Sequence, residues 1–354
     1  MNAAAESTEV PNPSWRDAAL DSVLRLSVLA AVPALLGYLG AWHWLLDLCA
    51  HFRWQYAAVL LLGLAAALLR RRHRFAAFLL TVWLVNGWSL ATATGPVAAS
   101  PVPASARPWK LLMVNVHVDN PDPAALLALI ERESPDVIGV LELSPRMAAA
   151  LAVLDARYPV RATDPRDDPF GIGLWSRLPD SRIEATPMPP IDLPTLRLVW
   201  RDPAPGALWL VHPFPPIGAE PSRWRDGQLA HLAERVRGEA QAIVAGDLNA
   251  TPWSVAYRRL RAEADLRDAS AAGWPWPTWS GPNVFAVLGI PIDHVLHGPG
   301  WHVVRHAVGP DIGSDHRPIV VEFVRAVANH GSMVSRSGQP ASSGLVAVTS
   351  PDVD

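Results

Sequence analysis

Three apolar runs near the amino terminus constrain the fold of this chain more than any other feature. They cover residues 24–48, 56–69 and 75–93. A helix needs about 20 apolar residues to cross a bilayer, so the first and third runs are long enough and the second is marginal. We predict a transmembrane region over residues 24–93, with three helices or with the second run as a re-entrant or interfacial hairpin.

Arginines between the second and third runs predict the orientation. Residues 70–74 read Arg-Arg-Arg-His-Arg, and clustered arginines stay in the cytoplasm. We therefore expect residues 1–23 to be cytoplasmic and everything after residue 94 to be extracytoplasmic. The long, partly acidic amino terminus argues against a cleaved signal peptide.

The rest of the chain divides into three parts. Residues 94–108 are rich in Pro and Ala, which predicts an extended linker, and residues 326–354 are Ser/Gly-rich, which predicts a disordered tail. Residues 109–325 alternate strand and helix patterns, which predicts an α/β domain. Helices are expected at 123–133, 145–154, 222–237 and 253–262, and strands at 110–117, 136–142, 171–176, 195–201, 207–212, 241–246, 292–297 and 318–324.

One predicted strand ends in a carboxylate and an amide. Residues 242–254 read Ala-Ile-Val-Ala-Gly-Asp-Leu-Asn-Ala-Thr-Pro-Trp-Ser, and the two-residue repeat of a strand places Asp247 and Asn249 on the same side. A carboxylate can take a proton from water while an amide donates to phosphoryl oxygens. The alternative is a structural Asx-turn, to which Gly-Asp-x-Asn is well suited.

Four further strands carry polar groups next to their ends. These groups are Asn115, Glu142, Asp293 and the adjacent pair Asp315 and His316. Acidic and amide oxygens without cysteine favour a hard divalent ion, Mg²⁺ or Mn²⁺.

These motifs resemble the endonuclease/exonuclease/phosphatase superfamily, over roughly residues 109–325. The resemblance implies two packed mixed β-sheets flanked by outer helices, a four-layer sandwich with its active site at one edge. It also implies that Asn115 and Glu142 hold the metal, with Asp315 contributing directly or through water.

The same resemblance implies the catalytic roles. Asp247 would orient or deprotonate water, Asn249 would bind the phosphate, and Asp293 would orient His316 toward the scissile group. His212 takes the place of the family's middle His or Tyr. The family often has Asn or Asp two residues after its first Asn, where this chain has His117, a possible ligand or a strand histidine with a local hydrogen bond.

The segment after His212 is similar to membrane-attached bacterial members, which implies a multi-pass protein of the bacterial plasma membrane. Arg225 is then a candidate phosphate contact, or else a helix-surface arginine paired with Asp226 or Glu220. Residues 107–325 hold 22 basic and 26 acidic side chains, so no strongly basic face for a polyanion is expected. A loop with Trp274, Trp276 and Trp279 either contacts membrane or packs onto the domain.

Three functions fit these observations. The first is a metal-dependent phosphodiesterase or phosphomonoesterase acting on a lipid, nucleotide or nucleic acid. The second is a DNase-like nuclease, and the third is a catalytically silent module that binds a phosphorylated ligand at the membrane. The bilayer and a phosphoester substrate are the expected partners, and no protein partner is predicted.

Overall fold

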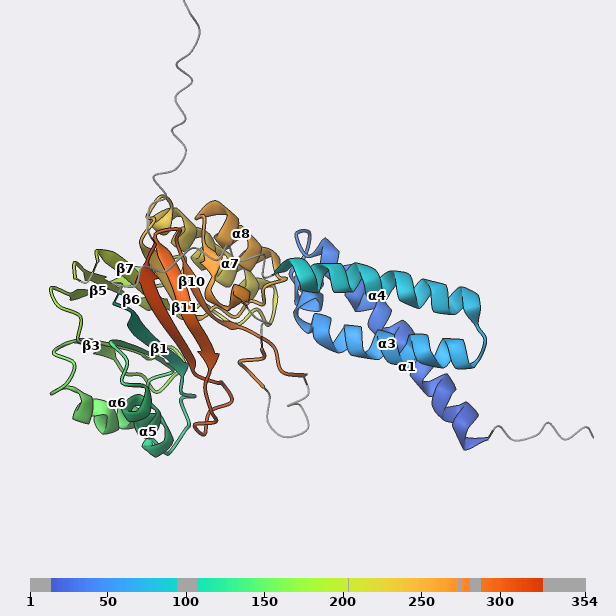
Figure 1. Ribbon diagram of the computed structural model, residues 1–354, viewed down its shortest axis with the longest axis horizontal. Coiled ribbons are helices and arrows are strands. Elements are labelled where there is room, and N and C mark those ends of the chain that lie inside the picture. The colour runs from blue at the N-terminus through green and yellow to red at the C-terminus, as the bar shows by residue number, and fades with distance from the viewer. Residues whose placement is uncertain (1–13, 94–106, 203, 273–275, 281–287, 327–354) are drawn as a thin grey trace, which may run out of the picture.

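The structure is a computed structural model that describes residues 14–93, 107–202, 204–272, 276–280 and 288–326. It contains a helical bundle that projects from an α/β domain (Figure 1). The predicted tail lies outside the described residues except for Ala326, and so does the predicted linker except for residues 107 and 108.

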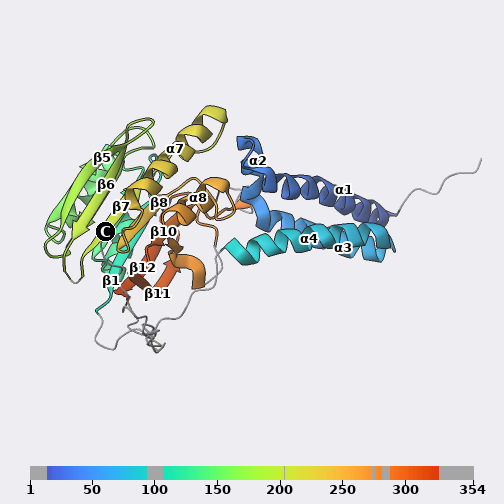
Figure 2. The same cartoon turned by 90° about the horizontal axis from the view of Figure 1, so that it is seen from above.

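The bundle contains three helices that are long and apolar enough to cross a membrane. They are α1 (Trp15–Leu36), α3 (Arg53–Leu69) and α4 (His73–Ala93), which lie side by side in two views (Figures 1 and 2). The short helix α2 (Trp44–Leu48) and a 3₁₀ turn (Cys49–Phe52) lead directly into α3. The second candidate span, Trp44–Leu69, is therefore 26 residues long. It is longer than the apolar run of residues 56–69, whose length the sequence analysis judged marginal.

The first apolar run does not form a single helix, so its predicted bounds of 24 and 48 are wrong. The helical span begins at Trp15, where Ser14 accepts a hydrogen bond from the Asp17 amide, and it ends at Leu39. The chain then turns back, and Gly40 packs so closely on Asp47 that a Cβ atom would lie 2.9 Å from its Cα. Apolar composition continued through this turn, which hid it from the sequence pattern.

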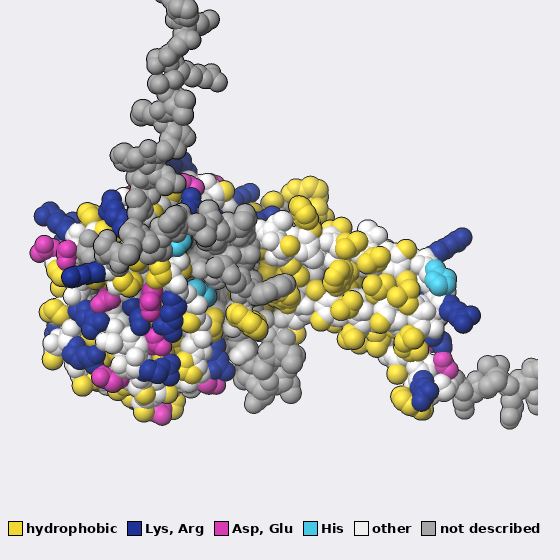
Figure 3. Space-filling view, in the orientation of Figure 1, with side chains coloured by type: hydrophobic (Ala, Val, Ile, Leu, Met, Phe, Trp, Pro, Cys, Tyr) yellow, Lys and Arg dark blue, Asp and Glu magenta, His cyan; other side chains and the backbone are white. Residues whose placement is uncertain are grey.

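Small residues bring the bundle helices together. A Cβ atom on Gly63 of α3 would lie 2.3 Å from the Ser27 side chain of α1, the kind of close approach that small residues permit between membrane helices. Apolar side chains cover the visible face of the bundle, and charged side chains gather at its far end (Figure 3). At that end Arg70 pairs with Asp17 and Asp21.

The domain contains two mixed sheets, as the resemblance implies, and each sheet has six strands. The first sheet has the order β11-β12-β1-β2-β4-β3 and the second β5-β6-β7-β8-β10-β9. Their strands are β1 (Trp109–Asn115), β2 (Val137–Leu141), β3 (Val160–Asp164), β4 (Ile172–Ser176), β5 (Arg182–Met188), β6 (Leu193–Trp200), β7 (Gly206–Val211), β8 (Ala242–Asp247), β9 (Arg267–Asp268), β10 (Asp293–His297), β11 (Trp301–Val308) and β12 (Ile319–Arg325).

Side-chain alternation along the central strands builds the layers. On β1, Leu111 and Met113 enter the core between the sheets, while Leu112 and Val114 face the outer helices. Helices α5 (Ala124–Glu133) and α6 (Pro145–Leu151) cover the first sheet. Helices α7 (Ala219–Val236) and α8 (Val255–Glu263) cover the second. The result is the four-layer sandwich that the resemblance implies.

Direct contacts dock the bundle onto the domain. Asp47 of α2 accepts hydrogen bonds from the Arg225 guanidinium of α7 at 2.9 Å and from the Val255 amide of α8 at 2.7 Å. Trp253 is buried in a cluster with Ala50 and Leu90 of the bundle. The helical bundle and the α/β domain are therefore joined by packed contacts as well as by the chain.

Candidate active site

Strand pairing brings the predicted site residues to one edge of the sandwich. Parallel pairing of β1 with β2 places the end of β1, at Asn115, beside Leu141, and Glu142 follows directly. In the second sheet, antiparallel pairing sets Asp293 opposite Asp247. The two strand ends of each sheet therefore deliver their polar side chains to a common point.

Local backbone geometry shapes this edge. Gly246 precedes Asp247, and a Cβ atom there would lie 1.9 Å from the carbonyl oxygen of Val211, so only glycine fits. Glu142 and Asn249 both have positive φ, 55° and 49°. Such a conformation is uncommon for residues other than glycine and is frequently found at functional sites.

Asn115 lies at the centre of the cluster and is fully buried. Its side-chain nitrogen is 2.8 Å from Glu142 Oε1 and 3.4 Å from Asp247 Oδ2. The other oxygen of Glu142 accepts a hydrogen bond from the Val118 amide at 3.0 Å. Two carboxylates thus converge on one small polar side chain.

Asp247 has one tethered oxygen and one oxygen that faces the cluster. Oδ1 accepts from the Asn249 amide at 2.9 Å, which is the Asx-turn that the sequence offered as the alternative interpretation of this motif. Oδ2 faces the Nε2 atoms of His212, at 3.5 Å, and His316, at 3.6 Å. Burial tends to raise the pKa of Asp247, but the hydrogen bond from His212 and the charge of His316 lower it overall.

Asn249 and His212 line the same edge. The Asn249 side-chain nitrogen donates to the Pro213 carbonyl at 3.0 Å, which fixes the amide next to Asp247. Burial tends to lower the pKa of His212, yet its hydrogen bond with Asp247 raises it overall. His212 Nδ1 is buried and has no hydrogen-bond partner within the described part of the chain.

Asp293 and His316 form the expected pair. His316 Nδ1 is 2.8 Å from Asp293 Oδ2, and both side chains are buried. Burial favours the neutral imidazole, but the nearby carboxylates of Asp293 and Asp247 outweigh it and raise the pKa of His316 to about 10. The geometry therefore maintains a charged imidazolium with Nε2 aimed into the cluster.

The cluster fits a divalent cation. Asp247, Asp293 and His316 each offer one ligand atom, and these atoms all lie within 4.8 Å of one another. Among the residues that the structure describes, Asp293 Oδ1 and Asp315 Oδ1 are buried without hydrogen-bond partners, as expected where a positive group belongs. The carboxylate oxygens are the ligands that Mg²⁺ and Mn²⁺ favour, whereas the His316 imidazolium would have to lose its proton to bind a cation.

Asp315 is held by an aromatic residue that the sequence did not assign to the site. Trp279 Nε1 donates to Asp315 Oδ2 at 2.9 Å. In the same loop, the Thr278 hydroxyl accepts from the amides of Ile292 and Asp293 at 3.2 and 3.0 Å. These positioning contacts bridge many residues of sequence, and no motif marked them.

Arg225 and His117 lie apart from the ligand cluster. Arg225 is 1% exposed, and its guanidinium contacts Asp47, Asp226 and the carbonyl oxygen of Asn249. Arg225 thus joins the bundle, through Asp47, to the loop after β8 that carries Asn249, which is called the catalytic loop below. These contacts take the place of the phosphate contact that the sequence suggested. The alternative prediction, a helix-surface arginine paired with Asp226, is right about the partner. It is wrong about the exposure, because Arg225 is buried against the bundle. His117 has a positive φ of 62°, and its amide donates to Asn115 Oδ1.

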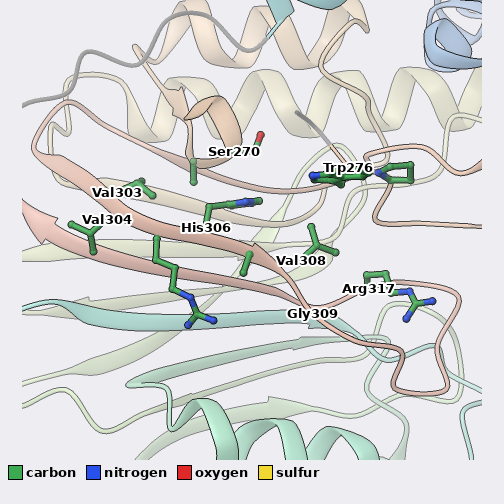
Figure 4. Close-up of a pocket in the computed structure, with 12 residues that line it drawn as sticks. Ser270, Trp276, Val303, Val304, His306, Val308, Gly309 and Arg317 are labelled. Atoms are coloured by element: carbon green, nitrogen blue, oxygen red, sulfur yellow. The ribbon is translucent and has the colours of Figure 1, made fainter. Parts of the chain in front are cut away.

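A separate groove of about 550 Å³ lies beside β11 (Figure 4). Its lining includes Ser270, Trp276, His306 and Arg317, and no residue of the catalytic cluster lines it. Of the two alternatives for the tryptophan loop, exposure fits Trp276, which is 67% exposed, and packing onto the domain fits Trp279, which donates to Asp315, whereas Trp274 lies outside the described residues.

The chain is similar to a known family and to several solved structures. The model of the Endonuclease/Exonuclease/phosphatase family matches residues 114–316. Among solved structures, the human nocturnin catalytic domain is 16% identical with a TM-score of 0.48, covering 62% of this chain and 94% of its own. An endonuclease/exonuclease/phosphatase from Beutenbergia cavernae is 20% identical with a TM-score of 0.49, covering 62% and 72%. Sphingomyelinase C from Streptomyces griseocarneus is 18% identical with a TM-score of 0.44, covering 61% and 99%. No curated protein matches the chain.

Proposed function

Because the chain belongs to the endonuclease/exonuclease/phosphatase family, we propose that it is a membrane-anchored phosphoesterase that hydrolyses phosphodiesters or phosphomonoesters with a bound divalent cation. The observation that carries the proposal is the convergence of Asn115, Glu142, Asp247, Asp293 and His316 at one edge of the sandwich. A structural role does not require three carboxylates and a charged imidazole to be buried together, since this arrangement costs free energy.

We propose that Asn115 and Glu142 hold the cation, with Asp315 contributing directly or through water. Asp247, Asp293 and His316 form a separate alternative ligand set, which shares no residue with the first. When bound, Mg²⁺ or Mn²⁺ would lower the pKa of water and offset charge on the phosphoryl group.

The protein side chains then have separate tasks. Asp247 Oδ2 orients the attacking water, because Oδ1 is already held by the Asn249 amide. Asp293 fixes the ring of His316, so that Nε2 donates a hydrogen bond to a phosphoryl oxygen as negative charge develops there. Asn249 and His212 add hydrogen bonds on the same face.

The position of the site favours a substrate in or near the membrane. The Asn249 carbonyl accepts from Arg225, and Arg225 pairs with Asp47 of the bundle, so the catalytic loop lies beside the helices. The domain has more acidic than basic side chains and contains one lysine, a poor composition for binding a polyanion by counterion release. A lipid or small phosphoester is therefore preferred over duplex DNA.

The orientation proposal places residues 70–74 in the cytoplasm of a bacterial cell and the domain outside it. The turn between α3 and α4, around residues 70–74, lies at the end of the bundle away from the domain (Figure 1), which supports this orientation. Basic residues near short membrane loops remain cytoplasmic.

A hydrolysis screen tests the proposal. Full-length protein in nanodiscs is assayed with Mg²⁺ or Mn²⁺ on phospholipids, small phosphate esters and duplex oligonucleotides, with His316→Ala as the inactive control. We expect turnover of a lipid or small ester to exceed duplex cleavage at about 150 mM salt, where phosphate contacts are weakened. Trp276→Ala should reduce action on vesicles more than on a soluble ester. Efficient duplex cleavage would support a nuclease, and activity equal to that of His316→Ala on every substrate would support a silent binding module.

A further inference from the structure

A second polar site lies where the membrane bundle meets the domain. A cleft of about 300 Å³ is lined by the last turn of α4, the segment before α8 and one face of α8. Ser89 and Thr92 come from α4, Trp253 precedes α8, and Arg258 and Arg261 come from α8. None of the catalytic residues lines it.

The cleft lies at the depth of the lipid headgroups. Helix α4 has 21 residues, about 32 Å at 1.5 Å per residue, which matches a hydrocarbon core of about 30 Å. With the arginine-rich loop at the opposite surface, Ser89 and Thr92 reach the interface on the domain side. Trp88 is 73% exposed on the same turn, and tryptophan is enriched at this boundary.

The charge of the cleft is unbalanced. Arg258 and Arg261 are three residues apart and therefore project from the same face of α8. Across the part of the chain that the structure describes, neither guanidinium has a carboxylate within ion-pair distance, whereas Arg177 and Arg305 do. Their hydrogen bonds go to backbone carbonyls: Arg258 to Ser254 at 3.4 Å, and Arg261 to Leu266 at 3.3 Å and Ala93 at 2.9 Å.

The other wall of the cleft is rigid and apolar. Trp253 is 2% exposed and packs on Ala50 and Leu90. Below the cleft, α4 presents the exposed apolar side chains of Leu84 and Val85 toward the hydrocarbon. A ligand with an anionic head and an apolar tail matches both parts, because arginine forks suit phosphate oxygens.

We propose that this cleft binds the phosphate of an anionic phospholipid, at a site separate from the catalytic cluster. The headgroup phosphate lies between Arg258 and Arg261, the hydroxyl of Ser89 donates to it, and the acyl chains follow α4, while the Thr92 hydroxyl donates to the Trp88 carbonyl. A free phosphate ion would engage the arginines alone and gain nothing from the apolar wall.

Lipid retention tests the proposal without reference to catalysis. Full-length protein is reconstituted in phosphatidylcholine nanodiscs with and without phosphatidylglycerol, and bound lipids are measured by native mass spectrometry after extraction. We expect wild type to retain phosphatidylglycerol in preference to phosphatidylcholine. Arg258→Gln together with Arg261→Gln should weaken this preference roughly 30-fold, since each basic group near an anionic surface contributes slightly less than one tenfold step.

Two controls make the result decisive. Arg259→Gln removes a neighbouring exposed charge that does not line the cleft, so it should leave the preference nearly unchanged. Arg258→Gln alone loses only one weak internal hydrogen bond, so it should fold normally. It should still reduce retention of phosphatidylglycerol severalfold, because it removes one of the two charges that face the phosphate. Equal losses in Arg259→Gln and Arg258→Gln would indicate general surface charge and overturn the site. Displacement by inorganic phosphate as effective as by phosphatidylglycerol would assign the cleft to a free anion and overturn the lipid assignment.

Discussion

The buried pair between Asp47 and Arg225 offers the sharpest test of how the membrane bundle acts on the domain. The side chains are 6% and 1% exposed. Asp47→Asn keeps the shape but removes the charge that faces the Arg225 guanidinium, and its amide nitrogen cannot accept the bond that the Arg225 or Val255 N–H now donates. Because Arg225 also contacts the Asn249 carbonyl, the change should loosen the catalytic loop as well as the junction.

The magnitude follows from what remains around Arg225. Removing one partner of a buried ion pair costs about 3–5 kcal/mol. In Asp47→Asn, Arg225 keeps its contacts with the exposed Asp226 and with the Asn249 carbonyl. We therefore expect a cost at the lower end of this range, about 3 kcal/mol. Such a loss raises the population of the open junction about 100-fold.

Hydrogen exchange of the full-length protein in nanodiscs measures this opening. The Val255 amide donates directly to Asp47, so peptides that contain it should exchange about 100-fold faster in Asp47→Asn. Asp226→Asn is the matched control, since Asp226 contacts the same guanidinium but is 53% exposed, and its effect should stay below about 1 kcal/mol. Equal exchange in the two variants would refute the argument that Asp47 fixes the junction.

Three further predictions concern catalysis, acid stability and topology. Asp293→Asn and His316→Ala should each lower kcat by orders of magnitude, and the double variant should be little worse than the poorer single one; additive losses would show that the pair does not act as a unit. The pKa of Asp268 is lowered because hydrogen bonds from His294, Ser270 and Tyr257 outweigh the effect of burial. The stabilisation from the ionised Asp268 is therefore present above the unfolded pKa of about 3.9 and is lost as pH falls toward the pKa of the folded protein. The unfolding free energy of wild type should therefore fall more steeply in acid than that of Asp268→Asn. Parallel curves for the two proteins would contradict this. A reporter that is active only after export should work when fused after Ala326, and activity of a cytoplasm-specific reporter there would reverse the proposed orientation.

The sequence predicted the central strands well and missed the edges. The four strands absent from the prediction, β3, β5, β9 and β11, are the four edge strands of the two sheets. An edge strand is paired on one side only and is often half exposed, as β3 is along its whole length. It therefore lacks the apolar run that identifies a buried strand.

The candidate cluster was accessible to sequence analysis because each member lies at an end of a buried strand or within three residues of one. Asn115, Asp247 and Asp293 were found in this way, and the structure brings them together. Asp47 gave no such signal. It lies in the short helix α2, 178 residues from Arg225, and only tertiary packing shows that the two side chains meet.

Metal dependence of hydrolysis tests the central claim most directly. Full-length wild type and Glu142→Gln are titrated with Mg²⁺ and Mn²⁺ after chelation, with the best phosphoester from the screen as substrate. Glu142→Gln keeps the shape of the side chain but removes an anionic ligand. We predict that wild type loses activity in chelator and regains it with either ion, and that Glu142→Gln needs far more metal and turns over more slowly. Undiminished hydrolysis in excess chelator, or a normal metal titration in Glu142→Gln, would contradict the account.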